Sequence, residues 1–431
     1  MPLPGTSLMR LWIDLTDLAA WRGPLTGIQH TVFNLASRYA GRTDVGFLAY
    51  DEVLRRFATV DFGQVRLRLD KPDTGTRAAV VAAAQQIFDH LPPAIRSLVA
   101  AQTSRRLRGL MEKTMRLRPA ADAPAPLSPD CVVLLPGMVW YHTGLLPDLC
   151  KLKRAVGFRL ATVIYDLLPA FHPQLYPDDF PRQFREHMVT LMSESSALLA
   201  ISRATQGDLQ RFCAQARLPV PDTRVFRLGD SLAPVTPVAP ATPPAPGEFI
   251  LTVGLEWRKN AILLYQMLKL AAQEGVQMPP LVIAGRPSWV KADHELIMRL
   301  LTRDPELRGR VQVLTGLDDA RLTWLYQNCR FTIFPSLCEG WGLPVAESLR
   351  QGKLCLASSA SSVPEVGAEL VEYASPYDPR AFLDLVRRYL DPQRLAEREA
   401  TIRAGYRPHD WDAAFVEFDR ALRQSLAGTE G

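Results

Sequence analysis

Two glutamates stand eight positions apart in the segment 331–352, whose sequence is FTIFPSLCEGWGLPVAESLRQG. A strand-like apolar run opens the segment, and Pro344 stands where the first turn of a helix should begin. We therefore expect Glu339 in a loop and Glu347 on the helix that follows. A carboxylate on the helix can accept two hydrogen bonds from ribose hydroxyl groups, and a carboxylate in the loop can hold a second sugar.

The stretch between the two glutamates is suited to close contact with a ligand. Gly340 and Gly342 let the backbone approach a ligand, because neither carries a side chain. The backbone N–H groups around Trp341 to Val345 would form the positive end of the helix, which attracts an anion or sugar hydroxyl groups. Gly340, Trp341, Gly342 and Leu343 are therefore candidates for ligand binding.

The segment resembles the E-x7-E signature of the retaining GT-B glycosyltransferases of family 4, with Glu339 and Glu347 as the two glutamates. The resemblance implies that Glu339 contacts the donor sugar and that Glu347 contacts the nucleotide ribose. It also implies an α/β fold of the GT-B type, in which two Rossmann-like doubly wound domains face a central cleft. Capping carboxylates on an ordinary helix are the alternative interpretation.

A second match lies at 252–260, TVGLEWRKN, directly after a strand-like run. It resembles the family's loop in which an arginine and a lysine hold the donor diphosphate, here Arg258 and Lys259, with Gly254 in the turn before them. Two cations can stabilise the negative charge that a departing nucleoside diphosphate gains. The scheme requires no metal, and Asp318-Asp319 is expected to begin a helix. The alternative for a pair of basic residues is solvated surface.

The corresponding glycine-rich loop of the first half is less complete. The segment 26–36, TGIQHTVFNLA, corresponds to the family's loop and helix that close over the donor phosphates. The family often has two adjacent glycines there, and this chain has Thr26 and Gly27. Only Gly27 is therefore carried over as a donor-binding residue.

Another first-half segment carries a candidate catalytic carboxylate. Residues 163–177, VIYDLLPAFHPQLYP, resemble the His-Asp-Leu-hydrophobic-Pro segment of bacterial mannosyl- and rhamnosyl-type members. Asp166 matches, and at the end of a strand it could orient the acceptor or polarise its hydroxyl group; capping a turn is the alternative. Tyr165 stands in place of the usual histidine.

Two parallel sheets are needed to position these residues. Apolar strand-like runs alternate with helical runs, which is typical of parallel sheets covered on both faces. In such sheets ligands bind beyond the carboxyl ends of the strands, where the motifs above lie. Strands are expected at 8–15, 131–135, 159–166, 196–202, 248–254, 281–285, 311–316, 331–335 and 353–359, and helices at 27–40, 260–275 and 411–426.

A proline-rich segment divides the chain. Residues 234–247, PVTPVAPATPPAPG, exclude helix and sheet interior and are expected to form an extended linker. We therefore expect an acceptor-binding domain at 1–233, a nucleotide-sugar-binding domain at 248–410, and a C-terminal helix at 411–431 that packs back toward the first domain. Residues 41–130 show no clear order of strands.

Composition and charge narrow the class of protein. Hydrophobic residues make up 47% and charged residues 22%, which excludes disordered and fibrous proteins. The six cysteines are scattered, which favours reduced thiols in a cytoplasmic protein. No signal peptide or membrane-spanning run is expected. The basic stretch 96–118 is either a solvated helical face or a peripheral contact with the inner membrane, and nucleic-acid binding is not expected, since no motif for it accompanies the charges.

The residues and the resemblance together favour one activity. We expect a retaining hexosyltransferase that moves a hexose, with mannose favoured, from a nucleotide sugar to a glycan or lipid-linked oligosaccharide of a surface polysaccharide such as lipopolysaccharide or capsule. GDP-mannose is the favoured donor, and no further cofactor is needed. The alternatives are a sugar phosphorylase or epimerase of the same fold, and an inactive scaffold in a polysaccharide assembly complex.

Overall fold

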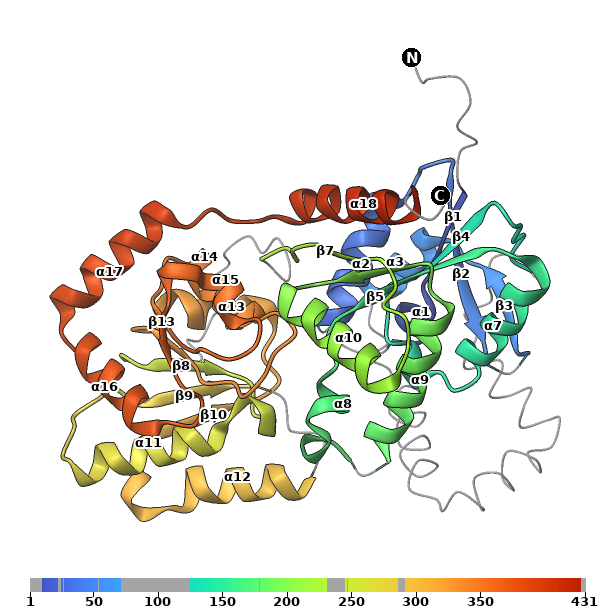
Figure 1. Cartoon of the computed structure of the whole chain (residues 1–431). Helices are drawn as coiled ribbons and strands as arrows, with labels where there is room; N and C mark the ends of the chain where they lie inside the picture. The colour runs from blue at the N-terminus through green and yellow to red at the C-terminus, as the bar shows by residue number, and fades with distance from the viewer. Residues whose placement is uncertain are drawn as a thin grey trace.

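The structure is a computed structural model that describes residues 10–21, 25, 27–52, 54–70, 124–177, 179–230, 245, 247–285 and 291–427. Two α/β domains lie side by side, each built around its own sheet (Figure 1). The basic stretch 96–118 and nearly all of the proline-rich segment 234–247 lie outside the described residues. The fold is the one predicted from the alternating pattern of strands and helices.

The first domain contains a seven-stranded sheet in the order β3-β2-β1-β4-β5-β6-β7. Neighbouring strands are parallel except for β2 and β3, which pair antiparallel at the sheet edge. Its strands are β1 (Arg10–Asp14), β2 (Val45–Asp51), β3 (Arg56–Thr59), β4 (Cys131–Leu135), β5 (Arg159–Ile164), β6 (Ala197–Ala200) and β7 (Thr223–Val225).

The second domain contains a six-stranded parallel sheet in the order β10-β9-β8-β11-β12-β13. Strand order reverses beside β8, because β9 lies on one side of it and β11 on the other; such a switch point is where open α/β sheets bind ligands. Its strands are β8 (Ile250–Val253), β9 (Leu281–Ala284), β10 (Val311–Leu314), β11 (Thr332–Phe334), β12 (Cys355–Ser358) and β13 (Glu372–Ala374).

Helices cover both sheets (Figure 1). The first domain has α1 (Thr16–Ala20), α2 (Gly27–Tyr39), α3 (Phe62–Asp70), α7 (Leu145–Val156), α8 (Leu168–Phe171), α9 (Phe180–Glu194) and α10 (Arg203–Ala216). The second has α11 (Ala261–Gln273), α12 (Lys291–Arg303), α13 (Asp319–Asn328), α14 (Leu343–Arg350), α15 (Val363–Gly367), α16 (Pro379–Tyr389) and α17 (Pro392–Gly405), and α18 (Trp411–Ala427) follows. Short 3-10 helices include η1 (Val139–Tyr141), η2 (Pro173–Leu175), η3 (Trp257–Lys259), η4 (Pro305–Leu307) and η5 (Ala368–Leu370).

The strands predicted from apolar runs are present because those runs form the sheet cores. Every residue of β4 is buried, and so is every residue of β6, β9 and β12. Continuous apolar runs are what a strand covered on both faces requires. The region 41–130, which shows no clear pattern in sequence, contains β2, β3 and α3 among its described residues.

Helix α18 belongs spatially to the first domain. An extended segment leads from α17 at the far side of the second domain to α18, which lies over the first sheet (Figure 1). The Phe418 ring is buried 5.0 Å from that of Phe226, and the Tyr39 hydroxyl donates to Asp419 at 2.7 Å. The first domain is therefore built from two separate parts of the chain.

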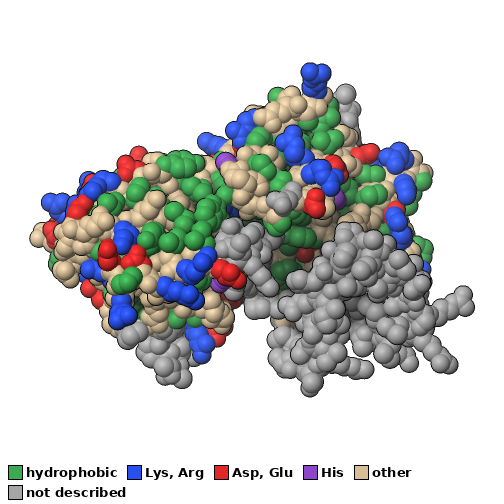
Figure 2. All heavy atoms as spheres, turned by 90° about the horizontal axis from the view of Figure 1, so that it is seen from below, with side chains coloured by type: hydrophobic (Ala, Val, Ile, Leu, Met, Phe, Trp, Pro, Cys, Tyr) green, Lys and Arg blue, Asp and Glu red, His purple; other side chains and the backbone are tan. Residues whose placement is uncertain are grey.

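The surface carries charges of both signs. On the face shown in Figure 2, acidic and basic side chains are interspersed along the edges of the second domain, with hydrophobic side chains between them. Among the residues that the structure describes, no helix is both long enough and apolar enough to cross a membrane.

Candidate active site

A cavity of about 830 Å³ opens between the two domains, at the ends of the strands of both sheets. From the second domain it is lined by the two cations, both signature glutamates and the start of α14, and from the first domain by the start of α2 and the loop after β5. The predicted site residues that line it are Gly27, Asp166, Arg258, Lys259, Glu339, Gly340, Trp341, Gly342, Leu343 and Glu347. Gly254 is the one predicted residue that is absent from the lining.

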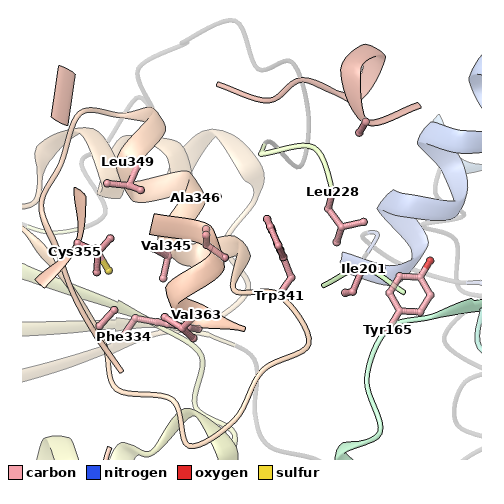
Figure 3. Close-up of a cluster of buried hydrophobic side chains, with 14 of the residues drawn as sticks. Tyr165, Ile201, Leu228, Phe334, Trp341, Val345, Ala346, Leu349, Cys355 and Val363 are labelled. Carbon is pink, nitrogen blue, oxygen red and sulfur yellow. The ribbon is translucent and has the colours of Figure 1, made fainter. Parts of the chain in front are cut away.

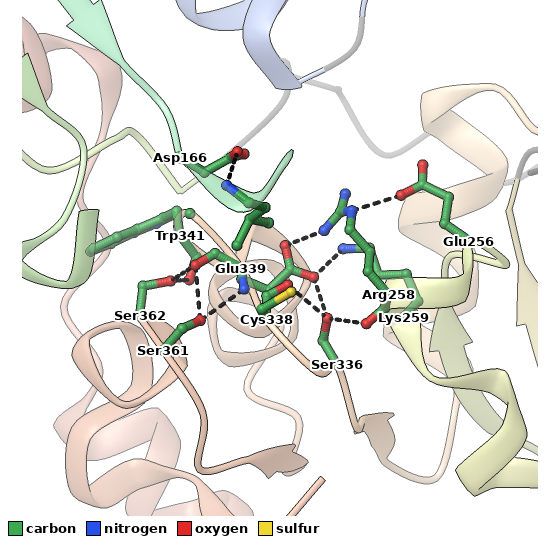
Figure 4. A network of polar contacts seen from close by, with 12 residues as sticks. Asp166, Glu256, Arg258, Lys259, Ser336, Cys338, Glu339, Trp341, Ser361 and Ser362 are labelled. Carbon is green, nitrogen blue, oxygen red and sulfur yellow. Dashed lines mark hydrogen bonds and ion pairs between the residues drawn. The ribbon is translucent and has the colours of Figure 1, made fainter. Parts of the chain in front are cut away.

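The carboxylate of Glu339 joins the two predicted cations (Figure 4). Arg258 Nη1 donates to Glu339 Oε2 at 2.6 Å, and Lys259 Nζ donates to Oε1 at 2.7 Å. The Ser336 hydroxyl lies 2.6 Å from Oε1, and Arg258 Nε lies 2.9 Å from Glu256. The two cations therefore converge on one point of the cavity wall, beside the loop between β11 and α14.

Burial and charge act on Glu339 in opposite directions. Burial alone would raise the pKa of Glu339, but the attraction of Arg258 and Lys259 outweighs it and lowers the pKa to about 2. Burial lowers the pKa of Lys259, and neighbouring Arg258 lowers it further. Glu339 is therefore ionised at neutral pH.

The loop that carries Arg258 and Lys259 is held in place by a glycine and by the side chain of Asn260. A Cβ atom on Gly254 would lie 2.7 Å from Lys259 Cγ, so a glycine is needed there for the lysine stem to pass. Asn260 caps α11, and its side-chain amide donates to the carbonyls of Pro335 and Pro376 at 3.0 and 2.7 Å. Gly254 therefore contributes to the site by leaving room for the Lys259 side chain, although it does not line the cavity.

Glu347 lies on α14, one turn beyond its start. Tyr326 of α13 donates a hydrogen bond to Glu347 Oε2 at 2.7 Å. Burial raises the pKa of Glu347 to about 7, against the lowering effect of the Tyr326 hydroxyl. Sequence reasoning missed Tyr326, because nothing in a helix of mixed pattern signals that its hydroxyl reaches a residue on the next helix.

The loop before α14 is held by two serines. The Ser361 hydroxyl accepts from the Glu339 N–H at 2.8 Å, and the Ser362 hydroxyl lies 2.8 Å from the Trp341 carbonyl (Figure 4). Trp341, which is 6% exposed, extends toward Leu228 and Ile201 of the first domain (Figure 3). The buried core is therefore continuous across the boundary between the domains.

The first domain contributes Gly27 and Asp166. A Cβ atom on Gly27 would lie 3.4 Å from Leu343, so the start of α2 faces the start of α14 across the cavity. Asp166 follows β5, and its Oδ1 accepts from the Leu168 N–H at 3.1 Å. Burial raises the pKa of Asp166, while Arg258 opposes this increase. Asp166 therefore caps a turn and also borders the cavity.

Tyr165 and His142 occupy distinct parts of the lining. The Tyr165 hydroxyl donates to the Pro136 carbonyl at 2.7 Å, so the residue that replaces the family histidine is tied to the first domain. His142 Nδ1 lies 3.0 Å from Glu52 Oε1. His142 thus has a structural partner and also borders the cavity.

The domains contact each other directly at one side of the cavity. A Cβ atom on Gly340 would lie 2.2 Å from the Tyr165 carbonyl oxygen, so the two backbones meet there. The Glu365 carboxylate of α15 accepts from the backbone N–H groups of Arg203 and Ala204, each at 2.8 Å. Glu365 thus caps α10 of the opposite domain, and the two domains are in direct contact on this side of the cavity.

Other polar candidates have structural roles. Asp318 caps α13 by accepting from the Arg321 N–H at 2.8 Å, which confirms the expected start of a helix. Across the described ranges, no group of three or more His, Cys, Asp or Glu side chains is arranged to hold a metal ion. All six cysteines are buried thiols.

Comparison with known sequences finds a family that the second domain resembles. Residues 241–407 match the family described as Glycosyl transferases group 1. Two relatives from Escherichia coli are the serotype-specific mannosyltransferase WbdA, 30% identical over 272 residues, and the O-antigen chain mannosyltransferase B, 26% identical over 233 residues. The first match covers 58% of this chain and 30% of WbdA, and the second covers 53% and 59%. The chain thus spans about a third of the length of WbdA.

Comparison with solved structures concerns the fold. Sucrose-phosphate synthase from Thermosynechococcus elongatus has a TM-score of 0.59 at 16% identity, with 97% of this chain and 100% of that chain covered. Anabaena HepE in complex with UDP-glucose has a TM-score of 0.60 at 14% identity, with 96% and 100% covered. Together with the two facing sheets, these matches show that the chain has the GT-B fold.

Proposed function

We propose that this chain is a retaining glycosyltransferase that moves a hexose, with mannose favoured, from a nucleotide sugar to a glycan or lipid-linked oligosaccharide in surface polysaccharide biosynthesis. The observation that carries the proposal is the convergence of Arg258, Lys259, Glu339 and Glu347 on one cavity between two Rossmann-like domains. The E. coli relatives named as mannosyltransferases support the choice of hexose, with GDP-mannose as the favoured donor.

The two cations are suited to a diphosphate. Arginine has five N–H donors and lysine has three, so each can hold Glu339 and still donate to a phosphate oxygen. Their contacts at 2.6 and 2.7 Å fix both side chains before a ligand arrives. Negative charge that develops on the departing diphosphate then meets donors already in place, an effect of about 3–4 kcal/mol for one such donor.

The remaining residues position the two sugars. Glu347 would accept hydrogen bonds from the ribose hydroxyl groups, and Glu339 would hold the transferred hexose near its carboxylate. Asp166 borders the cavity from the opposite domain, where it would orient the acceptor hydroxyl. Retention follows if the acceptor attacks from the face that the diphosphate leaves, with the departing phosphate oxygen taking the acceptor proton. The scheme requires no metal.

Calorimetry with GDP, UDP and dTDP tests the donor site. We expect one nucleotide to bind selectively, and the Lys259→Ala and Glu347→Ala variants to weaken it by at least tenfold. Lys269→Ala is a matched control, because Lys269 lies on α11 outside the cavity and pairs with Asp304 at 3.1 Å. The absence of binding by any of the three nucleotides at millimolar concentration would overturn the donor site.

A turnover assay then tests the reaction class. With the selected nucleotide sugar and an acceptor glycoside, we expect release of the nucleoside diphosphate and a product whose new linkage keeps the anomeric configuration of the donor, as read by NMR. Nucleotide binding without turnover would instead favour a scaffold role, and phosphate-dependent release of free sugar would favour a phosphorylase.

A further inference from the structure

The first-domain side of the cavity carries a cluster of aromatic rings, which we call the aromatic wall. It consists of Trp140, Tyr141, Tyr176, Phe180 and Phe184, and all five line the cavity. The Tyr141 and Phe180 rings are stacked with centroids 6.1 Å apart, and Tyr176 lies 5.7 Å from Phe180. Trp140 packs edge-on against Phe184 at 5.3 Å. Because the rings support one another, their shape is set before a ligand binds.

Part of this wall is open to solvent. Tyr141 is 44% exposed although it belongs to a packed cluster. It lies at the end of η1, which begins four residues after the last residue of the fully buried strand β4. An exposed aromatic ring on a rigid support is a surface that apolar ring faces of a ligand can cover.

The polar groups around the wall are two carboxyl groups and one paired imidazole. Asp17 borders the cavity with its Oδ2 held by Gln29 at 3.0 Å, and Asp166 borders it from the end of β5. Burial lowers the pKa of His142, but Glu52, 3.0 Å from His142 Nδ1, outweighs burial and raises the pKa. A protonated His142 is therefore already paired with an acidic side chain. In the described part of the first domain, no lysine or arginine lines the cavity.

This distribution of charge selects against an anionic acceptor. The lysine and the arginine of the lining, Lys259 and Arg258, both come from the second domain, where they pair with Glu339 and would hold the donor diphosphate. Whether Asp17 and Asp166 are ionised or protonated, they offer hydrogen bonds to hydroxyl groups and no positive charge. A carboxylate or phosphate on the acceptor would therefore be desolvated without a partner.

The aromatic wall also lies next to the proposed site of transfer. Tyr141 and Tyr176 line the same cavity as Asp166, Arg258 and Lys259. A sugar on the wall would thus share the cavity with the cations proposed to hold the donor.

We infer that the aromatic wall binds the acceptor as a neutral hexopyranose, whose apolar ring face covers Tyr141 and whose hydroxyl groups bond to Asp17 and Asp166. The inference rests on the proposed transferase function and narrows its acceptor: a glycan that ends in an uncharged hexose is accepted, and one that ends in a uronic acid or a sugar phosphate is not. Specificity thus arises as much from the lack of a lysine or arginine among the described first-domain lining residues as from the contacts.

Saturation-transfer NMR on the intact protein tests this without a donor. The probes are two matched pairs, the methyl α-glycosides of mannose and glucose and of the corresponding uronic acids, which differ only at C6. We expect the ring-face protons of at least one neutral glycoside to receive the strongest saturation, and its uronic partner to bind roughly tenfold more weakly.

Variants of the wall locate the contact. Tyr141→Ala is expected to abolish the signal, while Tyr141→Phe, which keeps the ring, retains it. Tyr377→Ala is the control, because Tyr377 is 78% exposed and lies outside the cavity. If Tyr141→Ala does not fold, as judged by circular dichroism, Tyr176→Leu takes its place.

The outcomes separate this inference from the proposed function. Equal or stronger binding of the uronic glycosides, no binding of any glycoside at millimolar concentration, or an undiminished signal in both wall variants overturns the inference. Nucleotide calorimetry on the same samples reports on the donor site alone. If glycosides bind as expected and no nucleotide binds, the sugar-binding site is supported and the proposed transferase function is contradicted.

Discussion

Replacing Tyr326 with phenylalanine should make nucleotide binding more dependent on pH. The Tyr326 hydroxyl donates to Glu347 at 2.7 Å and favours its ionised form, against the burial that raises the pKa of Glu347 to about 7. Only the carboxylate can accept two hydrogen bonds from a ribose at full strength. Wild-type affinity should therefore rise with pH through about 7, as Glu347 loses its proton.

The magnitude follows from the lost hydrogen bond. A hydrogen bond to a charged group contributes about 1.5–3 kcal/mol, and each 1.36 kcal/mol corresponds to about one pKa unit. The Tyr326→Phe substitution should therefore raise the pKa of Glu347 by a further 1 to 2, approximately. Half of the Glu347 side chains are ionised at pH 7 in the wild type, and roughly 1–10% in the variant. Affinity at pH 7 should fall about five- to fiftyfold and largely recover near pH 9.5.

Calorimetry at a series of pH values measures this effect. The wild type, Tyr326→Phe and Glu347→Gln are titrated with the nucleotide that the wild type selects, from pH 6 to pH 9.5. Glu347→Gln should bind weakly with a flat profile, since the titrating group is gone. Tyr265→Phe is the matched control, because Tyr265 donates to Asp304 at 2.9 Å and lies outside the cavity.

Two results would refute the reasoning. If the profile of Tyr326→Phe coincides with that of the wild type, the hydroxyl does not govern Glu347. If Glu347→Gln binds as tightly as the wild type at pH 9, Glu347 does not touch the nucleotide at all. A uniform loss of affinity at every pH would assign Tyr326 a merely structural role.

Two further substitutions test the contact between the domains at Glu365 and the packing of α18 on the first domain. Glu365→Ala removes the carboxylate that accepts both hydrogen bonds at the start of α10. We therefore expect the domains to separate, which gives a larger radius of gyration by X-ray scattering and leaves the unfolding midpoint unchanged. Glu369→Ala is the control, and an unchanged radius of gyration in Glu365→Ala would contradict the expectation. Phe418→Ala leaves a cavity in the core of the first domain and should cost about 3–5 kcal/mol in the free energy of unfolding. Val416→Ala on the same helix, at a 54% exposed position, should cost less than about 0.5 kcal/mol in the same denaturant titration, and equal losses would show that α18 is not packed as described.

Most of the fold is predictable from the sequence because the buried parallel strands consist of consecutive apolar residues. The expected runs 131–135 and 281–285 correspond to β4 (Cys131–Leu135) and β9 (Leu281–Ala284). The same rule does not predict the edge strands β7 and β13. Each contains only three residues, one of them charged, so neither forms an apolar run.

The candidate site was predictable where its residues are neighbours in sequence. The arrangement of Glu339, Glu347, Arg258 and Lys259 around one cavity agrees with the resemblance, although their roles remain predictions. Contacts between distant segments were not predictable. Glu365, near the start of α15, caps a helix of the opposite domain, a pairing that depends on how the two domains meet.

The return of α18 to the first domain has a consequence for synthesis of the chain. Phe418, Ala414 and Leu422 are buried in contact with the first domain, so its core stays incomplete until α18 leaves the ribosome. About 200 residues separate Asp230 from the end of α18, and at roughly 5–20 residues per second their translation takes about 10–40 s. During that interval the apolar groove that α18 later fills is exposed, and a chaperone that binds apolar segments would find it there. A nascent chain halted before α18 should therefore be captured by such a chaperone, and a chain halted beyond it should not.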